Sequence, residues 1–62
     1  MQSKLTAKEV DFISDLLTLE ESVCKKARIY SKTLTDQAVA GQMKTVADNA
    51  AKRYAELLGL LQ

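Results

Sequence analysis

Apolar residues recur every three or four positions along most of this 62-residue chain, and no proline interrupts them. This spacing places the apolar side chains on one side of an α-helix. The pattern runs from about residue 7 to about residue 33, and again from about residue 37 to about residue 61. Helix propensity dips over residues 34–36 between the two runs. The sequence therefore predicts an all-α fold, a single-domain antiparallel hairpin of two helices.

Local signals mark the expected ends of the helices. Thr6 and Glu9 have the spacing of a capping box, in which each residue accepts a hydrogen bond from a backbone amide of the other. Either Thr35 or Asp36 can cap the second helix. Gly41 lies inside that helix, and its lack of a side chain predicts the close approach of a neighbouring segment.

The small size of the chain predicts that it needs a partner. A chain of 62 residues buries only a marginal core by itself, and the usual remedies are disulfides, a metal or oligomerisation. One cysteine cannot form an internal disulfide, and the absence of histidine disfavours a metal site. Both apolar stripes are also wider than a two-helix contact requires. We therefore expect a homodimer forming a four-helix bundle, with a higher homo-oligomer or a hetero-partner as the alternatives.

Residues expected in the core or at the interface lie along both stripes. On the first helix they are Ile13, Leu16, Leu17, Glu20, Val23, Cys24, Ala27 and Tyr30. On the second helix they are Val39, Met43, Val46, Ala50, Arg53, Tyr54, Leu57 and Leu61.

Charge and hydropathy argue against other classes of partner. The net charge of +1 is too small for a general attraction to nucleic acid or anionic lipid. Lys25, Arg28 and Lys32 share a helix face that could contact phosphates, but no aromatic residues alternate with them, and we favour a solvated face. No apolar run approaches the ~18 residues of a membrane span. Residues 1–5 lack the apolar core of a signal peptide, so we expect an intracellular protein.

Glu20 and Cys24 are the two residues of the first stripe with chemistry to offer. Glu20 interrupts an apolar pattern, so it is either a metal ligand of a helical bundle or a boundary carboxylate paired with a cation, Arg53 being the best candidate. Cys24 is either a small core residue or a redox or intersubunit thiol. Because the chain has no histidine, we favour the Glu20–Arg53 pair and an unreactive Cys24, with no metal and no cofactor.

Several segments together resemble one known family. The run LTAKEV from Leu5, the run DLLTLEE from Asp15, the two lysines from Lys25 and the ending YAELLGLL from Tyr54 resemble the small (coat F-like) spore coat proteins of endospore-forming bacteria. The likeness covers nearly the whole chain, although no single motif is diagnostic.

The resemblance implies a half-ferritin hairpin that pairs into a four-helix bundle. In the wider group an inward glutamate of the first helix faces a Glu-x-x-His or His-x-x-His pair on the second. Glu20 matches the first position, but Ala50 and Arg53 stand at the others and neither is a normal metal ligand. This departure argues against di-iron chemistry.

The expected function is therefore structural rather than enzymatic. The chain shows no nucleophile with a base and no glycine-rich phosphate loop, and we expect no small-molecule substrate. The leading hypothesis is a spore coat component that acts in sporulation through helical-bundle oligomerisation. The alternatives are an adaptor that completes a bundle with a different protein and a degenerate ferritin-like metal protein.

Overall fold

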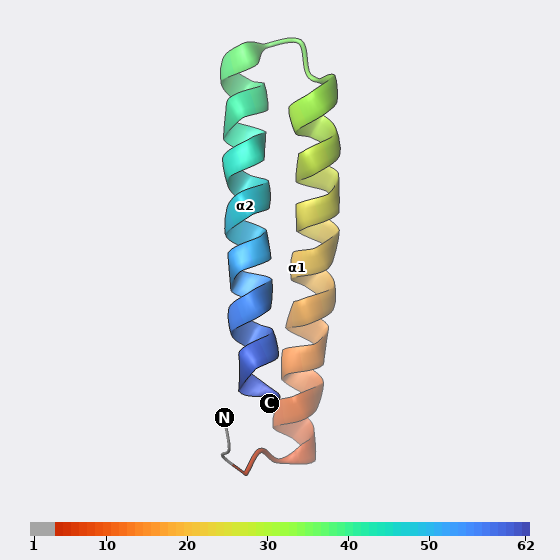
Figure 1. The fold of residues 1–62 in the computed structure, drawn as a ribbon. Helices are drawn as coiled ribbons and strands as arrows, with labels where there is room; N and C mark the ends of the chain where they lie inside the picture. Colours follow the sequence, from red (N-terminus) through yellow and green to blue (C-terminus); the bar gives the residue numbers. More distant parts are fainter. Residues whose placement is uncertain (1–3) are drawn as a thin grey trace.

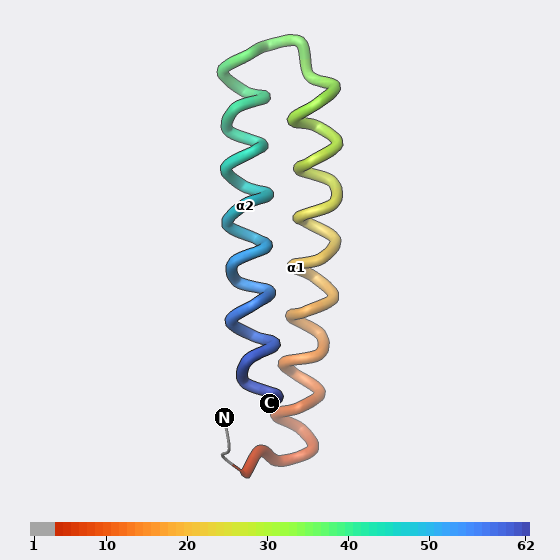
Figure 2. The backbone as a smooth tube through the Cα atoms, in the orientation of Figure 1, coloured from red at the N-terminus to blue at the C-terminus, as the bar shows by residue number. Residues whose placement is uncertain are grey.

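Two long helices packed side by side make up the protein in the computed structural model, which describes residues 4–62 (Figure 1). Helix α1 spans Ala7–Thr33 and helix α2 spans Gln37–Leu60. The helices run antiparallel, as the backbone trace in Figure 2 shows. The hairpin predicted from the sequence is confirmed, and α2 ends one residue earlier than expected. The first three residues of the opening segment considered above lie outside the described residues.

Hydrogen bonds from side chains fix the starts of both helices. The Thr6 backbone N–H donates to Glu9 Oε1 at 2.9 Å and the Glu9 N–H donates to Thr6 Oγ1 at 3.1 Å, which confirms the capping box. The bond from the Thr6 amide is the main cause that lowers the pKa of Glu9. At the second start Asp36 is the cap, since its Oδ1 accepts from the Val39 N–H at 3.0 Å.

The contact between the helices follows a strict alternation of three- and four-residue steps. We call this row the seam, and almost every buried or half-buried residue of the two helices belongs to it. Its members are Ile13, Leu17, Glu20, Cys24, Ala27 and Ser31 on α1, and Ala40, Met43, Ala47, Ala50, Tyr54 and Leu57 on α2. This repeat of 3.5 residues is the spacing of helices that pack at a shallow angle.

Alanine dominates the buried part of the seam. Among residues 4–62 the buried hydrophobic residues are Ile13, Ala27, Ala40, Ala47 and Ala50. Small side chains allow two helix axes to approach closely, but each removes little apolar surface from water. The hairpin by itself therefore has a narrow core.

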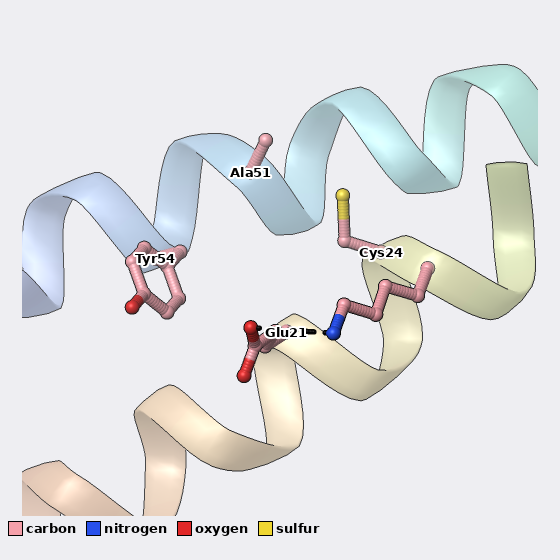
Figure 3. Close-up of a pocket in the computed structure, with 5 residues that line it drawn as sticks. Glu21, Cys24, Ala51 and Tyr54 are labelled. Atoms are coloured by element: carbon pink, nitrogen blue, oxygen red, sulfur yellow. Dashed lines mark ion pairs between the residues drawn. The ribbon is translucent and has the colours of Figure 1, made fainter.

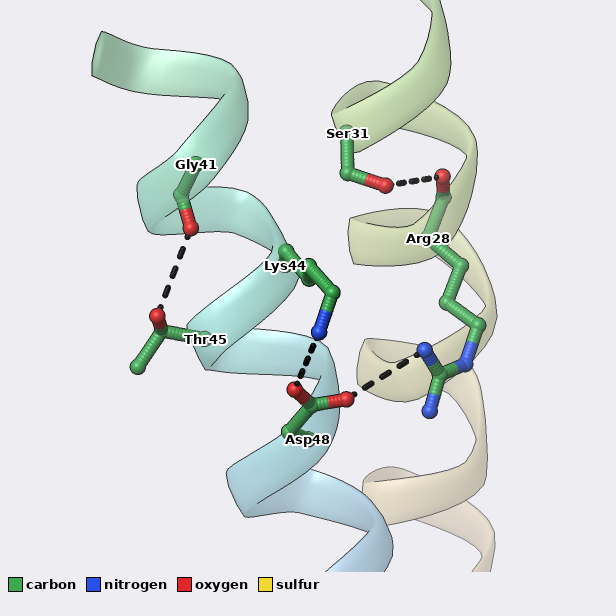
Figure 4. A network of polar contacts seen from close by, with 6 residues as sticks. All are labelled: Arg28, Ser31, Gly41, Lys44, Thr45 and Asp48. Carbon is green, nitrogen blue, oxygen red and sulfur yellow. Dashed lines mark hydrogen bonds and ion pairs between the residues drawn. The ribbon is translucent and has the colours of Figure 1, made fainter.

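Gly41 does not mark a close approach, so that prediction was wrong. A Cβ atom built at Gly41 would meet nothing within 4 Å. The Gly41 carbonyl oxygen accepts a hydrogen bond from the Thr45 hydroxyl at 3.3 Å (Figure 4). Gly41 lies about a third of a turn from the seam on the far side of α2.

Replacing Gly41 with alanine should therefore stabilise the hairpin. Alanine restricts the unfolded chain and favours helix by roughly 0.5–1 kcal/mol over glycine, with no clash to offset the gain. Thermal unfolding followed by circular dichroism would measure the difference. Gly59→Ala is the matched control, because it is equally unobstructed but lies in the last turn, where helices fray and the gain should be smaller. A lower melting temperature for Gly41→Ala would contradict this account.

Candidate functional site

The residues predicted for the core or interface divide into three groups by burial. Ile13, Ala27 and Ala50 are buried. Half-buried residues are Leu17, Glu20, Val23, Cys24, Met43, Tyr54 and Leu57. The rest are exposed in the single hairpin: Leu16, Tyr30, Val39, Val46, Arg53 and Leu61. The sequence-based list missed Ala40 and Ala47, which are buried in the seam.

Large apolar side chains gather on one side of the seam, on both helices. On α1 they are Phe12, Leu16, Leu19, Val23 and Tyr30, which recur at steps of three, four or seven residues. On α2 they are Val39, Val46 and Leu60, at steps of seven or fourteen. Counting 100° per residue, both rows lie roughly a quarter to a third of a turn from the seam in the same direction. We call this surface the open face.

All these side chains except Val23 remain exposed. Single exposed apolar residues are ordinary, but a contiguous row along two neighbouring helices is the mark of an interaction surface. The open face therefore is the candidate functional site.

Arg53 and Glu20 form an ion pair in the middle of the open face. Arg53 occupies the α2 row between Val46 and Leu60, and its Nε donates to Glu20 Oε2 at 2.8 Å. The Glu20 side chain is 16% exposed and the Arg53 side chain 51% exposed. This hydrogen bond is the main cause that raises the pKa of Arg53. The pairing expected from the sequence is present.

The opposite side of the hairpin carries most of the remaining ion pairs. Asp48 accepts from Lys44 Nζ at 3.0 Å and from Arg28 Nη1 at 3.4 Å, and the second bond joins the two helices (Figure 4). Lys25 pairs with Glu21 at 3.5 Å. The bond from Lys44 is the main cause that lowers the pKa of Asp48. Two cations of the expected basic face, Lys25 and Arg28, are thus already paired with carboxylates.

Cys24 lies in the seam, at the edge next to this opposite side. Figure 3 shows it at an open pocket lined also by Glu21, Lys25, Ala51 and Tyr54. Its thiol is half-buried and free. A histidine or a helix N-terminus, which can activate a thiol, is not near it, and the one cation at the pocket, Lys25, pairs with Glu21.

A metal centre does not fit the residues beside Glu20. Its Oε2 is held by Arg53, a group that only donates hydrogen bonds, and the Ala50 side chain offers no ligand atom. Within residues 4–62 no three His, Cys, Asp or Glu side chains come together in a way that could hold a metal ion. No helix in the same range is long and apolar enough to cross a membrane.

Comparison with known proteins identified no relative of this chain. No protein-family model, curated protein or solved structure matches the chain. The open face and its central ion pair are therefore the features on which a functional proposal rests.

Proposed function

We propose that this chain is a non-catalytic assembly protein whose unit is a homodimer, in which the open faces of two hairpins pack together as a four-helix bundle. The observation that carries the proposal is the way in which small and large apolar residues are divided between the seam and the open face. The seam buries mostly alanine, while Phe12, Leu16, Leu19 and other large side chains stay exposed on one face. Covering that face would supply the core that a short chain lacks.

The dimensions of the hairpin suit a second copy. It measures 47 × 16 × 11 Å between Cα atoms, so the flat outline of its broad side is roughly 750 Å², which sets the scale of the surface it can offer. A stable interface of standard size buries about 800 Å² on each partner. A two-fold axis lying in the plane of the interface would let the same surface serve both copies, which is the commonest closed arrangement.

The charges on the open face also permit self-association. Arg53 and Glu20 neutralise each other, so two copies meet without a net charge at the centre of the contact. The Arg28–Asp48–Lys44 group lies on the other side of the hairpin and stays in solvent. Polar groups outside and apolar groups inside are what a soluble bundle requires.

Sedimentation equilibrium over a range of protein concentrations tests the homodimer. We expect a mass twice that of the chain and a melting temperature that rises with concentration, because dissociation accompanies unfolding. A folded, helical monomer whose mass and melting temperature ignore concentration would overturn the proposal. That result would favour the adaptor, which completes a bundle with a different protein.

On the basis of the resemblance to small spore coat proteins, the proposed location of this structural role is the spore coat. It rests on the sequence runs alone, whereas the open face supports assembly wherever the protein is located. Presence of the chain in the coat fraction of purified spores would support this location.

A further inference from the structure

Arg53 stands at a position where an apolar residue would be expected. Along α2 the row of the open face reads Val39, Val46, Arg53 and Leu60, so a guanidinium group lies among aliphatic side chains. Its partner Glu20 is the central residue of α1, which places the pair near the middle of the face along that helix. A residue at the middle of a two-fold interface lies close to the symmetry axis, and therefore close to the partner.

The guanidinium group retains hydrogen-bonding capacity. It has five N–H donors, and within residues 4–62 its one hydrogen bond is that from Nε to Glu20. About half of the Arg53 side chain is exposed, so water reaches it in the single hairpin. Glu20 likewise uses one carboxylate oxygen for this bond, and its other oxygen can still accept.

When a second hairpin covers the open face, the Glu20–Arg53 pair is removed from water. A desolvated guanidinium with unmatched donors is costly, so the interface must offer an acceptor at this level. With the axis near Arg53, the partner's Glu20 can supply this acceptor, and Glu56, three residues further along α2, adds an attraction for Arg53 from its own helix. Two glutamates and two arginines then form a layer with no net charge. Sliding one hairpin by a helical turn would place each guanidinium against apolar residues.

We propose that Glu20 and Arg53 form a polar layer that fixes the register and orientation of the two hairpins, with each Arg53 bonded to its own Glu20 and to the partner's Glu20. This inference rests on the proposed homodimer and names the residues that determine how its copies align. Single polar layers of this kind set register and oligomeric state in other helical assemblies, often at the expense of stability.

Distances between spin labels on the two copies test this layer. Labels are attached at Ile29→Cys in a Cys24→Ala background, because Ile29 points away from the seam and lies off the open face. The starting protein should give one narrow distance between copies. The variant Glu20→Leu/Arg53→Leu should remain associated but give several distances, or form higher oligomers, because an all-apolar face permits more than one register.

A matched pair of substitutions supplies the control. Arg28→Leu/Asp48→Leu removes the other arginine–carboxylate contact between the two helices, on the side away from the open face, and should leave the narrow distance unchanged. A narrow distance in Glu20→Leu/Arg53→Leu would overturn the polar layer while leaving the homodimer intact. Absence of any distance between copies in the starting protein would overturn the homodimer itself.

Discussion

Replacing Leu16 with aspartate should weaken the proposed homodimer by two to four orders of magnitude in Kd. Leu16 lies on the open face and is 46% exposed in the single hairpin. Fully burying a leucine contributes about 1.5–3 kcal/mol, and about half of that remains to be gained at Leu16, so with two-fold symmetry the lost apolar burial alone costs association roughly 1.5–3 kcal/mol. A carboxylate buried without a partner adds to this loss. Sedimentation equilibrium measures the change directly.

Ile29→Asp is the control for this experiment. Ile29 is 57% exposed, more than Leu16, but it points away from the seam and lies off the open face. Its replacement should change Kd by less than about tenfold, because a surface change of this kind costs little. Equal effects of the two substitutions would mean that general hydrophobicity, and not the open face, drives association.

Replacing Ala47 with leucine should force the two helices apart. Ala47 is 0% exposed and lies in the seam, where Ala50 is also fully buried. Overpacking a filled core costs typically about 1–3 kcal/mol, which lowers the melting temperature of a domain this small by roughly 4–20 °C. Thermal unfolding at a fixed protein concentration would show it.

Ala55→Leu provides the same chemical change at an exposed site of the same helix. It should leave the melting temperature within a few degrees, because the larger side chain extends into solvent. If Ala47→Leu were as stable as Ala55→Leu, the seam would be looser than the burial of its alanines indicates.

Helix positions and ends could be predicted because they depend on local patterns. Apolar spacing located both helices, and the Thr6–Glu9 capping box marked the first start. For the second start two caps were possible, Thr35 and Asp36. Only the backbone geometry of the turn decides which side chain reaches the Val39 amide.

The choice of seam could not be read from the sequence. Each helix has a second apolar row beside the seam, and ranking by hydrophobicity selects the large residues of that row as core. The helices instead meet along the row that permits the closest approach, so Ala40 and Ala47 are buried while Leu16 and Val46 are exposed. Gly41 looked like a contact point because it lacks a side chain, but no other part of the hairpin comes within 4 Å of a Cβ atom placed there.

Glu20 was identifiable because a carboxylate within an apolar row must find a cation, and Arg53 was the suitable one. What the sequence could not give was the geometry of the pair. The structure shows that Glu20 lies in the seam, whereas Arg53 lies on the open face above it. A single contact thus belongs to both surfaces.

The alanine seam has a consequence for how such a protein can change over time. Apart from that one pair, the residues that hold the hairpin together are not those that would select its partner. Substitutions on the open face can therefore alter affinity or exchange one partner for another while the two helices stay joined. A gene duplication could in this way yield two hairpins that prefer each other, converting a self-associating unit into a heterodimer.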